Sequence, residues 1–326
     1  MRKIILVFLV INICTVGYTQ VLKGTVVDSK THQVIRLASV YFNGTFVGTS
    51  SDQHGRFELD VSKNSSMPLT VSAIGYYSVT LDDYATDKRL EVQLQPKDYG
   101  LQEVVTHTKS LKSRRQRNLR IFKDEFLGTT INSGICVILN ESDITFNYNS
   151  DKDTLKAFAS KPLEIDNKAL GYKVTYYLDK FEHYKRQNST FFRGNIIFTE
   201  DIASKLNPKH IEENRRNAYL GSRMHFFRIL WSKDDLNAKG FVVRKNTFDD
   251  LKSKDVVIEY NDNKFLKGNQ KLYVSYGRNV SYINFLKDYV YFDKTGYFDP
   301  AGINWQGAMG EQRVGDWLPN EYWPIQ

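Results

Sequence analysis

The fold of this protein is decided by one stretch near the N-terminus, Gly24 to Ser62, which reads GTVVDSKTHQVIRLASVYFNGTFVGTSSDQHGRFELDVS. Short runs of β-branched and aromatic residues alternate in it with clusters of Gly, Asn, Asp and Ser, a pattern typical of strands separated by tight turns. The pair Asn43-Gly44, between two such runs, predicts a hairpin. Residues 56–61 alternate with period two, so their apolar side chains share one face of a strand. The stretch therefore predicts a small β-sandwich.

With the flanking strands expected around residues 69–73 and 90–94, the sandwich covers residues 20–98 and has six or seven strands. Its motifs, in chain order, are G-x-V-x-D at 24–28, A-S-V at 38–40, N-G-T-x-x-G-T at 43–49, D-x-x-G-x-F at 52–57 and I-G-Y at 74–76. As a set they resemble the carboxypeptidase-regulatory-like domain. That resemblance implies a transthyretin-like, all-β sandwich of about seven strands.

The resemblance also has implications for function. In Bacteroidetes envelope proteins this module is common at the N-terminus, often ahead of outer-membrane barrels. It implies a Gram-negative envelope protein, and it implies no catalysis, since the module is normally an accessory.

Residues 1–19 have the pattern of a secretory signal peptide. Arg2 and Lys3 precede an apolar run, Ile4 to Cys14, and small or polar residues follow it. The run is too short to span a bilayer, and no later run approaches the ~18 apolar residues that a span needs. We therefore expect cleavage near Thr19, no transmembrane span in the mature chain, and a location in the periplasm or at the outer membrane.

The net charge of +8 is concentrated in one segment. Between Lys109 and Lys123 the chain has seven basic residues and no acidic one. The chain has 45 basic and 37 acidic residues. When these seven and the two basic residues of the leader are left out, 36 basic residues remain, nearly equal to the number of acidic ones. The high pI therefore does not describe a generally basic surface, and we expect no binding to nucleic acid.

The same segment lies in the region that joins the two expected domains, residues 99–128. Leu119, Phe122 and Phe126 have helical spacing and Gly128 suits a helix C-terminus, which predicts a helix over residues 110–127. Its other face carries the four candidate binding residues Arg114, Arg115, Arg117 and Arg120. Two interpretations stay open: a solvated helix face, or a surface that docks on an envelope protein or an anionic envelope surface.

Residues 129–326 are expected to form a second, β-rich α+β domain of unknown function. Its main helical region, residues 201–231, is expected to hold two helices that meet near Gly221-Ser222. The stretches LGYKVTYYLDKF at 170–181 and RRNAYLGSRMHFFRIL at 215–230 are similar to uncharacterised Bacteroidetes envelope proteins with the same domain pairing.

The candidate catalytic groups of this region do not assemble into a known motif. His210 and Glu213 have the H-x-x-E spacing of two zinc ligands, but the only later histidine, His225, follows 15 residues on, which does not suit a third ligand. Ser222 and His225 are helical neighbours without a nucleophile elbow. Cys136 lies in an apolar run and is expected to be buried. We expect no metal, no cofactor and no catalytic residue.

An aromatic stripe at residues 174–183 supplies the last candidates. Strict alternation would place Tyr177 and Phe181 on one face of a strand and Tyr176 and Leu178 on the other. Exposed aromatic rings could stack on sugars or peptides, whereas in a β-rich domain they can equally belong to the core. Tyr177 and Phe181 are retained as candidate binding residues.

Two functional hypotheses follow. The first is a non-enzymatic, exported envelope protein that acts as an interaction or scaffolding module. The alternative is an envelope hydrolase that acts on peptide or glycan with its site in residues 129–326, and a pocket of converging ionisable side chains would favour it.

Overall fold

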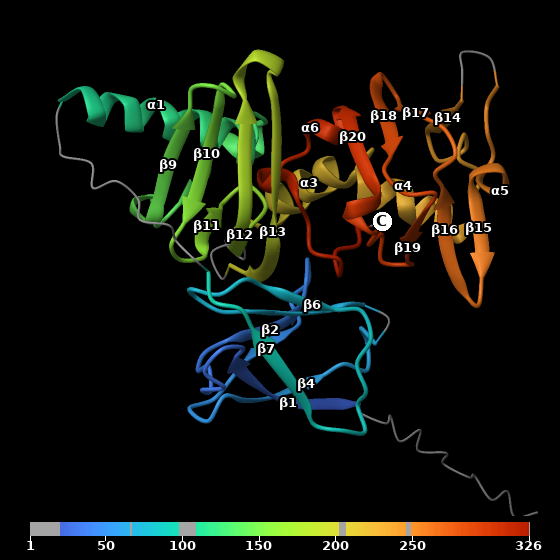
Figure 1. Ribbon diagram of the computed structural model, residues 1–326. Coiled ribbons are helices and arrows are strands. Elements are labelled where there is room, and N and C mark those ends of the chain that lie inside the picture. Colours follow the sequence, from blue (N-terminus) through green and yellow to red (C-terminus); the bar gives the residue numbers. More distant parts are fainter. Residues whose placement is uncertain (1–19, 66, 98–108, 202–206, 246–248, 326) are drawn as a thin grey trace, which may run out of the picture.

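The structure, a computed structural model, describes residues 20–65, 67–97, 109–201, 207–245 and 249–325. The expected signal peptide and residues 99–108 of the expected linker lie outside these residues. Figure 1 shows three β-rich regions: the N-terminal region lies below, and two further regions lie side by side above it.

The N-terminal region is a two-layer β-structure. Its strands are β1 (Val21–Asp28), β2 (Ser39–Phe42), β3 (Gly48–Ser50), β4 (Arg56–Asp60), β5 (Leu69–Ser72), β6 (Val79–Leu81) and β7 (Leu90–Leu94). They form two sheets, in the orders β4-β1-β7 and β3-β2-β5-β6. Apolar side chains of both sheets, among them Leu22, Val26, Val40 and Leu69, are fully buried in one core. The predicted sandwich of about seven strands is confirmed.

The sequence motifs of this region have visible structural roles. A Cβ atom at Gly24 would lie 2.4 Å from the Phe57 ring and 2.6 Å from the Leu90 carbonyl oxygen, so only glycine fits. Asp28 accepts hydrogen bonds from the backbone of the following turn, and the Tyr76 hydroxyl donates to it at 3.0 Å. The first and last motifs are therefore tied to each other.

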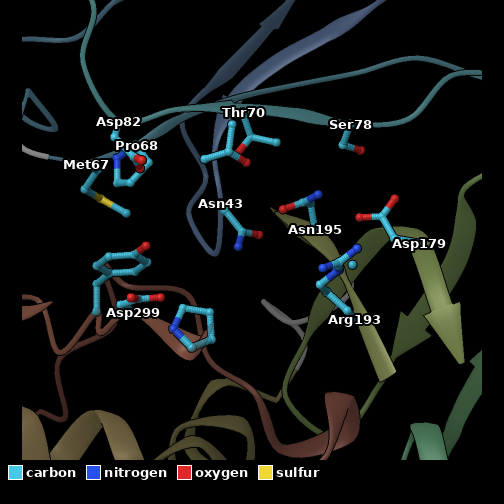
Figure 2. A pocket seen from close by; sticks show the side chains of 14 residues that line it. Asn43, Met67, Pro68, Thr70, Ser78, Asp82, Asp179, Arg193, Asn195 and Asp299 are labelled. Atoms are coloured by element: carbon cyan, nitrogen blue, oxygen red, sulfur yellow. The ribbon is translucent and has the colours of Figure 1, made fainter. Parts of the chain in front are cut away.

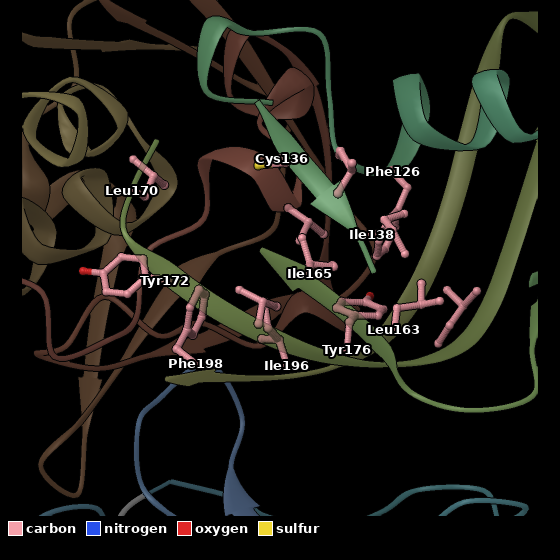
Figure 3. Close-up of a cluster of buried hydrophobic side chains, with 14 of the residues drawn as sticks. Phe126, Cys136, Ile138, Leu163, Ile165, Leu170, Tyr172, Tyr176, Ile196 and Phe198 are labelled. Atoms are coloured by element: carbon pink, nitrogen blue, oxygen red, sulfur yellow. The ribbon is translucent and has the colours of Figure 1, made fainter. Parts of the chain in front are cut away.

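The second region begins with helices and continues as a six-stranded sheet. Its elements are α1 (Lys109–Phe126), α2 (Ile131–Gly134), β8 (Cys136–Ile138), β9 (Ile144–Asn149), β10 (Thr154–Ala159), β11 (Leu163–Asn167), β12 (Tyr172–Tyr184) and β13 (Ser189–Glu200). The sheet has the order β8-β11-β12-β10-β9, and β13 pairs with β12. Phe122 and Phe126 of α1 are fully buried in its core, which Figure 3 shows around Tyr176 and Ile165.

The third region packs helices against two small sheets. Its elements are α3 (Pro208–Tyr219), α4 (Arg223–Ser232), β14 (Phe241–Arg244), α5 (Ser253–Val256), β15 (Val257–Tyr260), β16 (Asn263–Lys267), β17 (Leu272–Tyr276), β18 (Asn279–Phe285), β19 (Tyr289–Phe292), β20 (Ile303–Gly307) and α6 (Ala308–Glu311). Short 3-10 helices occur in the second region at Glu141–Asp143 and Lys185–Gln187, and after it at Pro300–Gly302 and Val314–Asp316. The sheets have the orders β14-β17-β18-β20 and β15-β16-β19.

The predicted β-rich region with several helices is confirmed, including the break between two helices. Gly221 has φ +75°, and the Ser222 hydroxyl caps α4 by accepting a hydrogen bond from the His225 backbone at 3.0 Å. Residues 129–326 bury two separate hydrophobic clusters, one under the six-stranded sheet and one around α4. The domain boundaries at residues 98 and 128 stay a prediction.

The aromatic stripe departs from the predicted alternation. The pairing of β12 with β13 shifts at one point: Leu178 is opposite Gly194, whereas Lys180 is opposite Arg193, so Asp179 is an extra, bulged residue. Phe181 consequently joins the core and is only 1% exposed. The expectation that Tyr177 and Phe181 share a face is wrong, because one inserted residue inverts a period-two pattern.

Candidate functional site

The N-terminal region is joined to the second region by the hairpin that Asn43-Gly44 predicts. The Gly44 backbone N–H donates to the Ile196 carbonyl at 2.9 Å, and the Phe198 N–H donates to the Thr45 carbonyl at 3.1 Å. Thr45 and Ile197 form a parallel β-bridge. The hairpin therefore adds to the free edge of β13 in the way an extra strand would.

Aromatic contacts reinforce this junction. The rings of Tyr41 and Tyr177 stack with their centroids 5.9 Å apart, and the Tyr177 hydroxyl donates to the Ser39 hydroxyl at 2.7 Å. Phe46 packs on Tyr172, with a centroid distance of 5.7 Å. Of the two aromatic candidates, Tyr177 thus contacts the N-terminal region and Phe181 lies in the core.

Residues near position 320 hold the hairpin from the other side. The Asn320 N–H donates to the Gly44 carbonyl at 2.8 Å, and the Phe46 N–H donates to Glu321 Oε1 at 3.0 Å. Arg228 of α4 donates to the carbonyls of Asn320 and Tyr322 at 2.9 and 2.7 Å. The hairpin tip is therefore clamped between β13 and a segment that is itself fixed to the third region.

A cavity of about 430 Å³ lies where the three regions meet. In Figure 2, Asp179, Arg193 and Asn195 lie at one end of it, and Met67, Asp82 and Asp299 at the other. Hydroxyl side chains line the wall contributed by the N-terminal region: Thr70, Ser78 and Thr80. The cavity is consequently a junction of three sequence-distant segments.

Asp179 has an unusual environment at this cavity. Burial raises the pKa of its carboxyl, whereas the charges of Lys97 and Arg193 act in the opposite direction. Lys97 Nζ lies 3.7 Å from Asp179 Oδ1, too far for a hydrogen bond. Within the part of the chain that the structure describes, Asp179 Oδ1 is buried and has no hydrogen-bond partner. Asp179 thus brings an acceptor with unused hydrogen-bonding capacity to the cavity wall.

The four arginines predicted on the basic helix have two different environments. Arg114, Arg117 and Arg120 are exposed, and Arg120 forms an ion pair with Asp124 at 3.8 Å. Arg115 instead donates hydrogen bonds to the carbonyls of Ile144 and Glu141, at 2.7 and 2.8 Å. Arg115 therefore connects α1 to the sheet, and the other three face outward.

The other candidates from the sequence lie on α3, at α4 and in β8. His210 and Glu213 are exposed on α3, and the described ranges contain no group of three or more His, Cys, Asp or Glu residues that could hold a metal ion. Ser222 is the cap of α4, and His225 is buried, with its pKa lowered to about 4 by burial and by nearby cations. Burial raises the pKa of the Cys136 thiol to about 12, which makes it a poor nucleophile.

The comparison with protein families concerns the N-terminal region. The model of the CarboxypepD_reg-like domain matches residues 22–106. Residues 22–106 are a CarboxypepD_reg-like domain. All seven strands β1–β7 lie within or at the edge of this match. The CarboxypepD_reg-like domain therefore contributes the docking hairpin and one wall of the cavity.

Among solved structures, the chain is similar to a protein of unknown function from Bacteroides fragilis NCTC 9343 that is proposed to be membrane-associated. The identity is 13%, and the alignment covers 88% of this chain and 94% of that one, with a TM-score of 0.19. A score this low supports no argument about function. No curated protein matches the chain. Of the helices in the described residues, none has the length and apolar character needed to cross a membrane.

Sequence reasoning did not single out the cavity residues Asp179, Arg193 and Asn195. One indication was present in the sequence. Tyr176 and Leu178 keep the period of two, and the next core residue, Phe181, follows after three positions. A change from even to odd spacing inside a strand is the pattern of a bulge, and the residue inserted there is Asp179.

Proposed function

We propose that this chain is an exported, non-enzymatic protein of a Gram-negative cell envelope, in which the CarboxypepD_reg-like domain and the regions behind it form one interaction scaffold. The scaffold docks on an anionic membrane leaflet through the outward face of α1, which comprises Lys112, Arg114, Arg117 and Arg120. The observation that carries the proposal is that these four basic side chains are exposed while the opposite face of the same helix is locked in the core.

The charge of this outward face is only weakly compensated. Asp124, itself half exposed, is the acidic partner near its end, at 3.8 Å from Arg120. Such an exposed i,i+4 pair contributes little, about 0.3–0.5 kcal/mol. Basic residues close to an anionic surface each contribute about 1 kcal/mol at physiological salt. Three arginines therefore account for about 3 kcal/mol, or about a hundredfold in affinity.

Export rests on the pattern of residues 1–19, a short positive segment followed by an apolar run and small residues. It agrees with the usual occurrence of the CarboxypepD_reg-like domain in envelope proteins. Location in the periplasm or at the outer membrane is part of the proposal. N-terminal sequencing of the protein from its native host should find a chain that begins near residue 20, and an intact Met1 would contradict export.

The docking experiment compares three proteins by co-sedimentation with vesicles of phosphatidylcholine, with and without phosphatidylglycerol. The test variant is Arg114→Gln/Arg117→Gln/Arg120→Gln, which leaves Arg115 and the apolar face intact. The matched control, Lys30→Gln/Lys63→Gln/Lys88→Gln, removes the same number of charges from exposed positions of the CarboxypepD_reg-like domain.

We expect the wild type and the control to bind the anionic vesicles, and the test variant to lose most of that binding. Raising the salt concentration should weaken wild-type binding, because the Debye length falls to ~8 Å at 0.15 M and shortens further above it. Equal binding by all three proteins, or binding that does not depend on salt, would end the proposal. Capture of an acidic protein without any vesicle binding would also contradict it.

The alternative, a hydrolase that acts on envelope peptide or glycan, is favoured by one observation, the cavity with its ionisable side chains. Asp179 and Asp299 in it each lie close to a lysine, Lys97 at 3.7 Å and Lys287 at 2.7 Å. No histidine is among the lining residues that the structure describes. Release of product from peptidoglycan fragments by the wild type, lost in Asp179→Asn, would establish the alternative.

A further inference from the structure

We propose that the cavity between the three regions binds a neutral saccharide of one or two sugar units. This cavity is separate from the outward face of α1, and its ligand is independent of the docking of that face. The volume of about 430 Å³ is within the usual range for small-molecule sites, about 300–1,000 Å³.

The composition of the cavity wall indicates a ligand that forms hydrogen bonds over most of its surface. Ordinary small-molecule pockets are mostly apolar. Here ten of the fourteen lining residues have hydroxyl, carboxamide or charged side chains. Carboxylates, carboxamides and the arginine guanidinium are planar groups whose two polar atoms can bind two neighbouring hydroxyls at once. Vicinal hydroxyls of this kind are the defining feature of a sugar.

The charges at the cavity balance in number, with the carboxylates of Asp82, Asp179 and Asp299 against the cations of Lys97, Arg193 and Lys287, which indicates a neutral ligand. At one end, Lys97 and Arg193 both act on the Asp179 carboxylate. At the other end, Lys287 Nζ forms an ion pair with Asp299 at 2.7 Å. An anionic or strongly cationic ligand would therefore upset this balance of charge. A neutral ligand can use the remaining hydrogen-bonding capacity and leave the ion pairs in place.

One unused hydrogen-bond acceptor at the cavity can be named. Asp179 Oδ1 is buried, and no donor among the described residues lies within hydrogen-bond distance of it. An unpaired buried acceptor is costly, and a hydroxyl donor that reaches it recovers that cost. Asp179 is the bulged residue of β12, and it lines the cavity together with Arg193 and Asn195 of the paired strand β13.

The apolar part of the wall also suits a sugar. Met67 and Pro68 lie at the end opposite to Asp179 (Figure 2), and Tyr297 and Pro300 also line the cavity. The C–H groups of a pyranose form apolar faces that pack on such rings, while the hydroxyls at its edge reach polar side chains. The cavity thus offers an apolar surface and planar polar groups to the same ligand.

The test uses the full chain and a panel of defined probes: glucose, galactose, mannose, N-acetylglucosamine, and the disaccharides maltose, cellobiose and chitobiose. Saturation-transfer-difference NMR and thermal unfolding are measured with each sugar up to about 20 mM, which covers millimolar affinities. The cavity variant is Asn195→Ala, and a second one, Asp179→Asn, keeps the shape and removes the charge. The matched control is Asn304→Ala, an exposed asparagine of β20 outside the cavity.

We expect saturation transfer to at least one neutral sugar, and a rise in melting temperature that grows with its concentration. Asn195→Ala should weaken binding about fivefold or more, while Asn304→Ala should bind as the wild type does. The sugar should be recovered intact. The triple glutamine variant of α1 should bind it normally, so this result is independent of vesicle binding.

Two results would overturn the proposal: no neutral sugar binds the wild type at about 20 mM, or Asn195→Ala and Asp179→Asn both bind as tightly as the control. Tighter binding of glucuronic acid, glucosamine or a peptide than of every neutral sugar would overturn the assignment of a neutral saccharide. Retained vesicle binding with no sugar binding would leave the proposed docking function standing and remove the cavity proposal alone.

Discussion

His225 is expected to make the protein acid-sensitive. The ring is 7% exposed and lies among aromatic rings, with centroid distances of 4.7 Å to Tyr219, 4.9 Å to Phe241 and 5.5 Å to Tyr276. Its Nδ1 accepts a hydrogen bond from the Gly221 N–H at 3.2 Å. Burial, assisted by the nearby charges of Arg228 and Lys239, lowers its pKa from 6.5 to about 4.

The direction of the effect follows from proton binding. Between pH 6.5 and about 4, His225 is protonated in the unfolded chain and neutral in the folded one. Acidification therefore favours unfolding, and the stability due to neutral His225 is lost as the pH falls through this window. The pKa of His225 is about 2.5 units lower in the folded chain than in the unfolded one. At 1.36 kcal/mol per unit, the free energy of unfolding falls by about 3 kcal/mol once the pH is below both values. Between pH 7 and pH 5 the expected loss is about 2 kcal/mol.

The assay compares the wild type with His225→Phe by urea denaturation at pH 7 and pH 5. Phenylalanine keeps an aromatic ring in the cluster and cannot titrate. Buried carboxyls such as Asp293 and Asp316, whose pKa values are raised by burial, titrate in both proteins and cancel in the comparison. The wild type should lose about 2 kcal/mol more than the variant on going from pH 7 to pH 5.

A second measurement is independent of the unfolding model. The NMR titration of the His225 ring in the folded protein should give an apparent pKa well below the ordinary value of about 6.5. A midpoint near 6.5, or equal losses of stability in the two proteins, would refute the reasoning that burial keeps this ring neutral.

Three further predictions concern the fold. Gly194→Ala should destabilise the protein by several kcal/mol, because its Cβ would lie 2.3 Å from a β12 carbonyl oxygen, whereas Gly134→Ala, with nothing within 4 Å, should change the melting temperature little. Arg115→Gln should cost about 1–3 kcal/mol in urea denaturation, and Arg117→Gln should stay within about 0.5 kcal/mol; equal effects would contradict the different environments of the two residues. Residues 20–98 alone should give a dispersed NMR spectrum of a β-protein, and a disordered spectrum would contradict independent folding.

Much of this fold could be predicted from the sequence because its determinants are local. The turn at Asn43-Gly44, the helical spacing of Phe122 and Phe126 and the break at Gly221 each depend on a few neighbouring residues, and all were found where expected. The site could not be predicted in the same way. The bulge at Asp179 is defined by pairing with β13, and it inverts the face of each residue that follows it.

The pairing of the hairpin with β13 also could not be predicted from the sequence. From the sequence, Asn43 and Gly44 serve a turn, and glycine suits it because φ is +79° at that position. The structure adds that the same backbone pairs with β13 and that the Asn43 carboxamide accepts a hydrogen bond from the Ile196 N–H at 2.7 Å. A local pattern can specify the turn, but it has no information about a partner strand some 150 residues away in the chain.

The clamp on the hairpin has a consequence for the order in which the molecule is assembled. Phe46 and Glu321 are separated by 275 positions, so the ribosome must add all of these residues before the hydrogen bond between them can form. Domains made early generally fold early. The hairpin of the CarboxypepD_reg-like domain can therefore pair with β13 once residue 200 has been added, whereas its contact with Glu321 has to wait for about 120 further residues. In the interval between the two events the hairpin is held by β13 alone, and the side of it that faces Asn320 and Glu321 is still open.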